Sequence, residues 1–152
     1  MAILTQEIKE FIKKVKLAFV ATVCPDGTPN LSPKGTTTVW DEQHLVFADI
    51  HSPGTTENIR VNSSVEINIV DVFLRKGYRF KGIATILSQG SLFEQILSFY
   101  KSEGLKFAVQ NIVLIKIERI QPVFSPAYDL GVSEEEVVKR WTAYWNSIDS
   151  FS

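Results

Sequence analysis

The sequence predicts a mainly β protein: an antiparallel, Greek-key-like sheet that closes into a small barrel, with helices at its periphery. The first observation is the turn sequence Cys24-Pro25-Asp26-Gly27-Thr28-Pro29 between two β-rich stretches. Proline followed by Asp-Gly is typical of tight turns that join antiparallel neighbours. The second is the alternation of apolar and polar residues over 65–70, the pattern of a half-buried strand. Strands joined mostly by short connections favour closure of the sheet.

In chain order, the pattern predicts a helix, three strands, a short helix, two strands, a helix, a strand and a final helix. Apolar residues at helical spacing place the first helix at 4–16, and the apolar stretch 17–23 forms the first strand. The later strands are expected at 30–40, 44–49, 65–70, 78–88 and 112–124. The later helices are expected at 55–62, 91–100 and 133–148.

Local signals refine these elements. The Ser91–Glu94 and Ser133–Glu136 spacings both match the capping box, in which a serine hydroxyl accepts a hydrogen bond from an amide in the first helical turn. Pro33 lacks the N–H that a central strand requires, so it indicates an edge strand or a bulge. Gly82, inside an expected strand, indicates a bend or a close backbone approach.

Composition excludes several classes of function. The 152 residues carry a formal net charge of −1, which argues against an electrostatic nucleic-acid binder. No apolar run approaches the roughly twenty residues of a membrane helix. The single cysteine, Cys24, excludes an internal disulfide, and with only two histidines the chain has no metal-binding spacing. We expect a cytoplasmic, single-domain protein (1–152) with a barrel core at about 5–124 and a helical tail at 125–152.

The segment 50–58 carries the clearest functional signal. It is typical of a strand end, a Pro53-Gly54 turn, and hydroxyl residues that open a short helix. Free N–H groups at a helix start, with Ser and Thr beside them, form an anion site. Lys34 lies on a strand that can run alongside, and a lysine near a helix N-terminus suits a phosphate monoester. The alternative is an ordinary helix cap next to a solvated lysine.

Five short segments occur in order along the chain: PDGTP at 25–29, SPKG at 32–35, VFAD at 46–49, SPGTTENI at 52–59 and RFKGIA at 79–84. In this order and spacing, the chain resembles the pyridoxamine 5′-phosphate oxidase-like family, the FMN-binding split β-barrels, over about residues 5–120. The resemblance implies a split-barrel homodimer with two FMN sites at the subunit interface.

The resemblance also implies a set of cofactor-binding residues. Hydroxyl residues and Asn58 would surround the FMN phosphate, and Lys34 would approach the phosphate or the ribityl chain. Backbone groups around 47–50 would line the edge of the flavin ring. Arg79 and Lys81 would contribute from the second subunit or neutralise charge. The full set is Ser32, Lys34, Gly35, Ala48, Asp49, Ile50, His51, Ser52, Thr55, Thr56, Asn58, Arg79 and Lys81.

Two departures from the family pattern matter. Many family members carry a basic residue where this chain has Pro53-Gly54, so we expect Arg60 or Lys34 to compensate for the missing charge. The segment 125–152 does not match the C-terminal substrate-binding signature of true pyridoxamine phosphate oxidases. Resemblance to the fold therefore does not assign that reaction.

Structural alternatives exist for several of these residues. Arg79 and Lys81 can instead pair across strands with Glu66 or Asp71, which we favour. His51 is either a surface-loop histidine or a residue beside the flavin whose charge tunes the ring near neutral pH.

Residues outside the expected site are assigned to structure. Cys24 is expected to be structural, because no base or cation is placed to activate its thiol. Trp141, Tyr144 and Trp145, on the last helix, are expected to pack against the barrel or a second subunit, with stacking over the flavin as the alternative.

The chain contains no nucleophile–base pair, which agrees with chemistry performed by a cofactor. We expect an FMN-dependent oxidoreductase that reduces a small molecule in a two-electron step with NAD(P)H as the donor; its catalytic residues are unassigned. The alternatives are a non-enzymatic flavin carrier or binding module, a deazaflavin- or haem-binding relative on the same fold, and a barrel without a cofactor.

Overall fold

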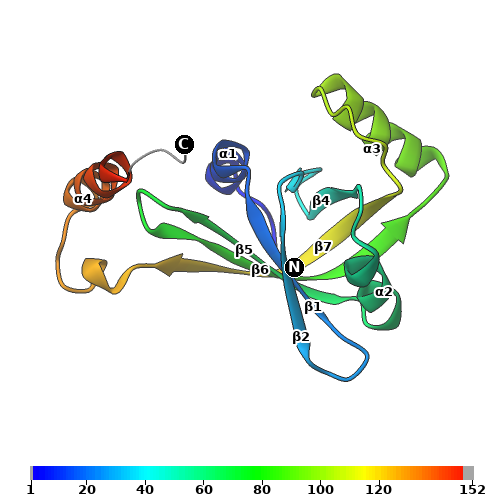
Figure 1. Cartoon of the computed structure of the whole chain (residues 1–152), viewed down its shortest axis with the longest axis horizontal. Coiled ribbons are helices and arrows are strands. Elements are labelled where there is room, and N and C mark those ends of the chain that lie inside the picture. Colours follow the sequence, from blue (N-terminus) through cyan, green and yellow to red (C-terminus); the bar gives the residue numbers. More distant parts are fainter. Residues whose placement is uncertain (1, 149–152) are drawn as a thin grey trace.

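The computed structural model describes residues 2–148 (Figure 1). The strands are β1 (Ala18–Val23), β2 (Pro29–Lys34), β3 (Thr38–Val39), β4 (His44–Asp49), β5 (Ser64–Asp71), β6 (Lys76–Leu87) and β7 (Asn111–Phe124). The helices are α1 (Gln6–Val15), α2 (Pro53–Val61), α3 (Ser91–Ser102) and α4 (Glu134–Ser147), with a short 3-10 helix η1 (Pro126–Tyr128) before α4. None of these helices is both long enough and apolar enough to cross a membrane.

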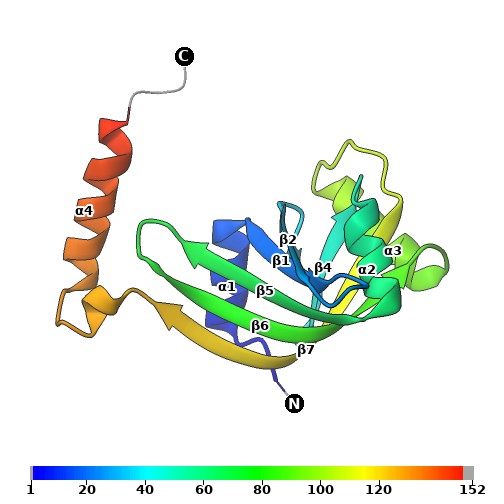
Figure 2. The ribbon, with the colours of Figure 1, turned by 60° about the horizontal axis from the view of Figure 1, so that its bottom comes forward.

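The seven strands form one antiparallel sheet in the order β2-β1-β5-β6-β7-β4-β3. β4 lies beside β7 although three connections separate them in the chain, which is a Greek-key arrangement. The sheet curls around its concave face, and its terminal strands β2 and β3 are linked through the chain at 35–37 rather than by a ladder (Figures 1 and 2). The predicted mainly β split barrel is confirmed.

Two apolar clusters position the helices. The concave face of the sheet is filled by alternate residues of β1, β5, β6 and β7, and α1 closes it with Ile8 and Ile12. The opposite face of β4 and β7 is covered by α3, whose Phe93, Ile96 and Tyr100 pack on Val46. Within residues 2–148, no helix covers the convex face of β2, β1, β5 and β6 (Figure 2).

Three local predictions are confirmed. β2 lies at an edge of the sheet, where Pro33 needs no ladder donor. Gly82 follows a register shift between β6 and β7, and a Cβ at that position would lie 2.4 Å from the carbonyl oxygen of Lys116. Ser133 caps α4, because its hydroxyl accepts a hydrogen bond from the amide of Glu136 at 3.2 Å.

Two predictions were wrong in detail. The expected strand 30–40 divides into β2 and β3, because the amide and hydroxyl of Thr37 both turn back to the carbonyl of Lys34. The expected capping box at Ser91 is absent, because α3 starts one residue earlier than that motif requires. Gly90 is the capping residue, with a φ of 101°, and no side chain caps the helix. Ser91 is therefore the first helical residue.

We expect Gly82→Ala to lower the free energy of unfolding by about 3 kcal/mol, because the added methyl group meets backbone atoms of β7 that have no room to move. Urea denaturation followed by circular dichroism measures this change. Gly54→Ala is the matched control, since a Cβ at Gly54 meets nothing within 4 Å. Equal stability of the two variants would contradict the close approach at Gly82.

Candidate functional site

Four polar residues from two elements meet at the start of α2. Lys34 Nζ donates a hydrogen bond to Ser52 Oγ at 2.8 Å, and Ser32 Oγ lies 3.4 Å from Thr55 Oγ1. We call Ser32, Lys34, Ser52 and Thr55 the Lys34 cluster. The alternation of side chains along β2 explains the meeting, because Ser32 and Lys34 stand opposite inward-facing residues of β1 and so point toward α2.

The N-terminus of α2 offers unused donors to this cluster. Pro53 is the first helical residue and has no N–H, and the Ser52 side chain makes no capping hydrogen bond. The amides of Gly54 and Thr55 therefore belong to the first turn, where a helix supplies no acceptor of its own. The helix dipole adds a partial positive charge at the same place. A negatively charged oxygen is the group these donors suit.

Lys34 adds a full positive charge. Burial lowers the pKa of its ammonium group, and the nearby carboxylate of Asp49 partly opposes this effect by raising it. Lys34 takes part in none of the ion pairs of residues 2–148. An arriving anion would therefore gain a charged donor that no carboxylate at hydrogen-bonding distance already neutralises.

Asp49 fixes the turn that carries the cluster. Its buried carboxylate accepts one hydrogen bond from the amide of Ser52 at 2.8 Å and one from the side-chain amide of Asn111 at 3.0 Å. These bonds tie the end of β4 to the start of α2 and to the start of β7. Asp49 thus holds the turn in place. Each of its carboxylate oxygens already accepts a hydrogen bond from the protein.

Two other expected ligands are engaged in the scaffold. The hydroxyl of Thr56 donates to the carbonyls of Ser52 and Pro53, at 3.2 and 3.1 Å. The buried Asn58 amide donates to Thr22 Oγ1 at 3.1 Å and contacts Cys24 Sγ at 3.6 Å. Thr56 therefore stabilises the first turn of α2, and Asn58 joins α2 to β1.

The structure does not bring Arg79 and Lys81 to the Lys34 cluster of the same chain. Both lie on the convex face of β6, where their side chains pair with Glu66 at 3.4 and 3.7 Å. The cross-strand pairing that we favoured is confirmed with Glu66 as the partner. Arg60 is exposed in the last turn of α2, so Lys34 is the cation that lies at the Pro53-Gly54 turn.

The remaining expected residues surround the turn. The amide of Ala48 donates to Thr36 Oγ1 at 3.0 Å, and that hydroxyl lies 3.3 Å from the carbonyl of Ala48. Ile50 is half-buried and His51 is exposed. Gly35 directly follows Lys34 in the chain and is the first residue of the corner between β2 and β3.

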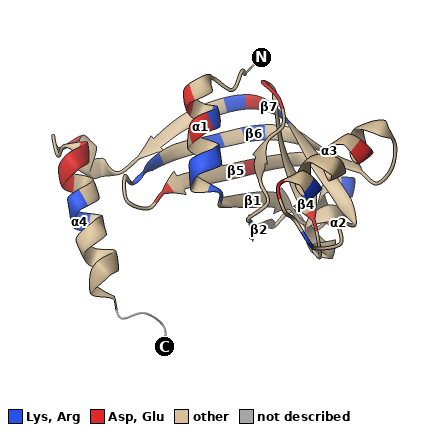
Figure 3. Cartoon of the chain, turned by 90° about the horizontal axis from the view of Figure 1, so that it is seen from above, with Lys and Arg blue, Asp and Glu red and all other residues tan. Residues whose placement is uncertain are grey.

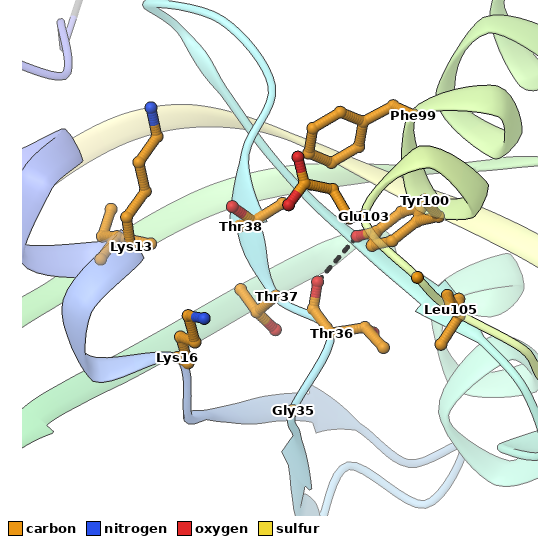
Figure 4. A pocket seen from close by; sticks show the side chains of 12 residues that line it. Lys13, Lys16, Gly35, Thr36, Thr37, Thr38, Phe99, Tyr100, Glu103 and Leu105 are labelled. Atoms are coloured by element: carbon orange, nitrogen blue, oxygen red, sulfur yellow. Dashed lines mark hydrogen bonds between the residues drawn. The ribbon is translucent and has the colours of Figure 1, made fainter.

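A cavity of about 330 Å³ adjoins the cluster at Gly35. Figure 4 shows it between the end of α1, the corner 35–38 and the end of α3. Tyr100 supports this corner: its hydroxyl lies 2.7 Å from the carbonyl of Thr36 and 3.2 Å from that of Val46. Burial raises the pKa of Tyr100, so the phenol keeps the proton that it donates. Lys13, Lys16 and Glu103 line the rim.

No motif in the sequence indicates Tyr100 or Thr36 as supporting residues. Tyr100 lies on the apolar face of α3 with Phe93 and Ile96, where packing is the ordinary role. Its polar partners are 64 and 54 residues away in the chain, so no local pattern reveals them.

The comparisons with known proteins decide the family. Residues 4–123 match the family model of pyridoxamine 5′-phosphate oxidase. The chain belongs to this family. HupZ from Group A Streptococcus is 34% identical, with a TM-score of 0.72, over 80% of this chain and 94% of that one. A search of curated proteins finds no match.

More distant structures share the fold alone. An FMN-binding protein from Syntrophomonas wolfei is 16% identical, with a TM-score of 0.67, over 80% of this chain and 87% of that one. An F420 reductase is 17% identical, with a TM-score of 0.60, over 77% of this chain and 98% of that one.

We expect Asp49→Ala to lower the free energy of unfolding by about 2 kcal/mol, because it leaves the half-buried amides of Ser52 and Asn111 without their acceptor. Thermal and urea unfolding measure the loss. Glu57→Ala, an exposed change on the same helix, should stay within about 0.5 kcal/mol of the parent. An Asp49→Ala protein as stable as Glu57→Ala would rule out the supporting role of Asp49.

Proposed function

We propose that this chain binds FMN and uses it to reduce a small molecule with electrons from NAD(P)H. The observation that carries the proposal is the 2.8 Å contact of Lys34 with Ser52 at the open N-terminus of α2. Family membership and the fold shared with an FMN-binding protein support a flavin as the ligand. The sequence resemblance implies an FMN phosphate at the same turn, which supports this assignment.

Each residue of the cluster has a separate task in this proposal. Lys34 supplies the charge, and the hydroxyls of Ser32, Ser52 and Thr55 and the amide of Gly54 supply donors to the phosphate oxygens. Asp49, Thr56 and Asn58 hold these donors in place through the bonds described above. His51 is exposed beside the turn and is proposed to border the flavin.

The proposed chemistry belongs to the cofactor. A bound flavin accepts and passes on two electrons, and the protein binds it, orients it and limits the access of water. Among the described residues, the cluster contains no nucleophile–base pair. This favours a role in which the cofactor supplies the chemistry and the protein binds and orients it. Gly35 and the adjoining cavity provide space for a ring or a small substrate beside the phosphate position.

A homodimer is part of the proposal. The family resemblance implies that FMN lies between two subunits, and the convex sheet face is open to a second copy. In such a dimer, Arg79 and Lys81 contribute to the partner's site rather than to their own.

The F420 reductase on the same fold makes a deazaflavin the second candidate ligand. Both ligands carry a phosphate, so the Lys34 cluster serves either. Mass analysis of the ligand released from purified protein separates them: FMN supports the proposal, and a deazaflavin replaces it.

Oxidation of NAD(P)H by the FMN-loaded protein tests the enzymatic part. An enzyme should oxidise NADH or NADPH repeatedly once a small-molecule acceptor such as a quinone is added. A protein that is reduced only by another redox protein, and never by NAD(P)H, is an electron carrier. That outcome would contradict the oxidoreductase assignment while leaving FMN binding intact.

We expect Lys34→Met to weaken FMN binding by about tenfold to a hundredfold, because one charge-assisted hydrogen bond to the phosphate is lost. Binding of riboflavin, which lacks the phosphate, should change less than about twofold. Quenching of flavin fluorescence measures both constants. Arg60→Met is the matched control, since this cation lies at the other end of α2. Equal losses for FMN and riboflavin would show that Lys34 does not hold the phosphate.

A further inference from the structure

A second cavity lies at the other end of the molecule from the Lys34 cluster. Figure 1 shows η1 and the start of α4 beside the tip of the β5–β6 hairpin, at one end, and α2 at the other. The cavity at this tip has a volume of about 640 Å³, within the range of roughly 300–1,000 Å³ that small-molecule sites occupy. It shares no lining residue with the Lys34 cluster or with the cavity at Gly35. We call it the hairpin cavity.

The floor of the hairpin cavity continues the concave face of the sheet. Tyr78 of β6 is paired with Pro122 of β7, and both line the cavity. Tyr78 lies two residues before the buried Phe80, so its side chain is on the same face of β6 as the core. The first turns of α1 form one wall, because Glu7 and Phe11 also line the cavity.

The outer wall is fixed to the hairpin. The amide of Ser125 donates to the carbonyl of Arg75 at 2.9 Å, and the hydroxyl of Tyr128 donates to the carbonyl of Leu74 at 2.5 Å. The guanidinium of Arg75 lies 3.5 Å from the ring centroid of Trp141 on α4. These contacts hold η1 and the start of α4 against the tip, so the cavity has a supported wall.

The rest of α4 leaves this wall. Tyr144 and Trp145, further along the helix, are 49% and 43% exposed. Their rings meet each other edge to face, and Tyr144 meets Trp141 in the same way. Of the three aromatic residues that we expected to pack, Trp141 is the one that lies beside the hairpin, where Arg75 covers it.

Aromatic rings supply much of the lining. Phe11 and Tyr78 meet edge to face, with 5.2 Å between their ring centroids. The ammonium of Lys76 lies 4.2 Å from the centroid of the Tyr128 ring, so this ring already holds a cation over its face. The face of an aromatic ring attracts positive charge, and aromatic walls are a common means of recognising organic cations.

The charges of the lining are mainly negative. Three carboxylates, those of Glu7, Asp129 and Glu134, and one ammonium group, that of Lys76, line the cavity. Lys76 pairs with Glu134, whereas Glu7 and Asp129 join no ion pair within residues 2–148. Figure 3 shows acidic segments in α1 and at the start of α4, on two sides of this end of the sheet. A cation that enters therefore meets carboxylates that no basic side chain of the described chain pairs with.

The phenol of Tyr78 senses this field. Burial raises its pKa, and the negative charge of Glu7 raises it further, while Lys76 opposes both effects. The Glu7 carboxylate is thus close enough to act on a group in the floor of the cavity. An anionic ligand would meet the same unfavourable field as the ionised phenol.

We propose that the hairpin cavity binds a small aromatic cation, an amine or an amidinium, whose ring lies against Phe11 and Tyr78 and whose charge faces Glu7 and Asp129. The aromatic lining supplies apolar contact and attraction to the positive charge, and the carboxylates accept its N–H groups. The site is separate from the Lys34 cluster, so the proposal does not rest on the proposed function.

Three probes that share one ring and differ in charge test the proposal. Benzamidine is a cation at pH 7, benzamide is its neutral counterpart and benzoate is an anion. In calorimetric titrations of the full chain without flavin, benzamidine should bind at least about tenfold more tightly than benzamide, and benzoate should bind more weakly than either. Equal constants for benzamidine and benzamide, or no saturable binding of benzamidine up to about 10 mM, would overturn the proposal.

Substitutions that keep the shape of the side chain test the position of the charge. Glu7→Gln and Asp129→Asn should each weaken benzamidine about threefold to tenfold and change benzamide less than about twofold. Glu10→Gln is the matched control, because Glu10 is exposed on the same helix and does not line the cavity. Effects of Glu7→Gln and Asp129→Asn no larger than that of the control would overturn the placement.

A competition titration separates this site from the flavin site. Benzamidine should bind with the same constant, within about twofold, whether or not FMN has been added, because the two sites share no residue. Displacement of FMN by benzamidine would place the cation in the flavin site and overturn the proposal. The other two titrations are made without flavin, so their outcome is independent of FMN binding.

Discussion

The buried carboxylate of Asp49 fixes the turn on which the candidate site depends. It accepts hydrogen bonds from Ser52 at the start of α2 and from Asn111 at the start of β7, so three elements meet at one side chain. Because Ser52 is held there, its hydroxyl reaches Lys34 on the edge strand. The same turn carries the amides of the first turn of α2, which have no acceptor within the helix. The site thus combines a rigid support with donors that the fold leaves unused.

Strand register decides which charges belong to this site. Lys34 stands opposite Ala18, so it shares the concave side with the core. Arg79 is paired with Asn68 of β5, and Asn68 is paired in turn with Phe19 of β1. All three side chains lie on the convex side of the sheet. Successive side chains alternate between faces, and a shift of one residue would exchange the two sets. Arg79 and Lys81 therefore lie on the convex face, whereas Lys34 lies on the concave side beside the start of α2.

The sequence predicted the sheet, the edge position of Pro33 and the meeting of Lys34 with the helix start, because each depends on short-range patterns. The functions of Thr56 and Asn58 were harder to predict. The side-chain amide of an asparagine beside such a turn can bind either a ligand or a neighbouring strand. Asn58 donates to Thr22, which lies 36 residues away in the chain, so no local pattern reveals this partner. The failed capping box at Ser91 has a local cause, since Gly90 adopts a backbone conformation that other residues avoid.

In the proposed function, the Lys34 cluster holds the phosphate of a bound FMN. The visible absorption spectrum of the purified protein, followed by mass analysis of what heat releases, tests it most directly. We expect a yellow protein that releases FMN, with less flavin retained by Lys34→Met. A colourless protein that also fails to bind added FMN would show that the cluster does not hold this phosphate, and it would point to Pro53-Gly54 as the reason.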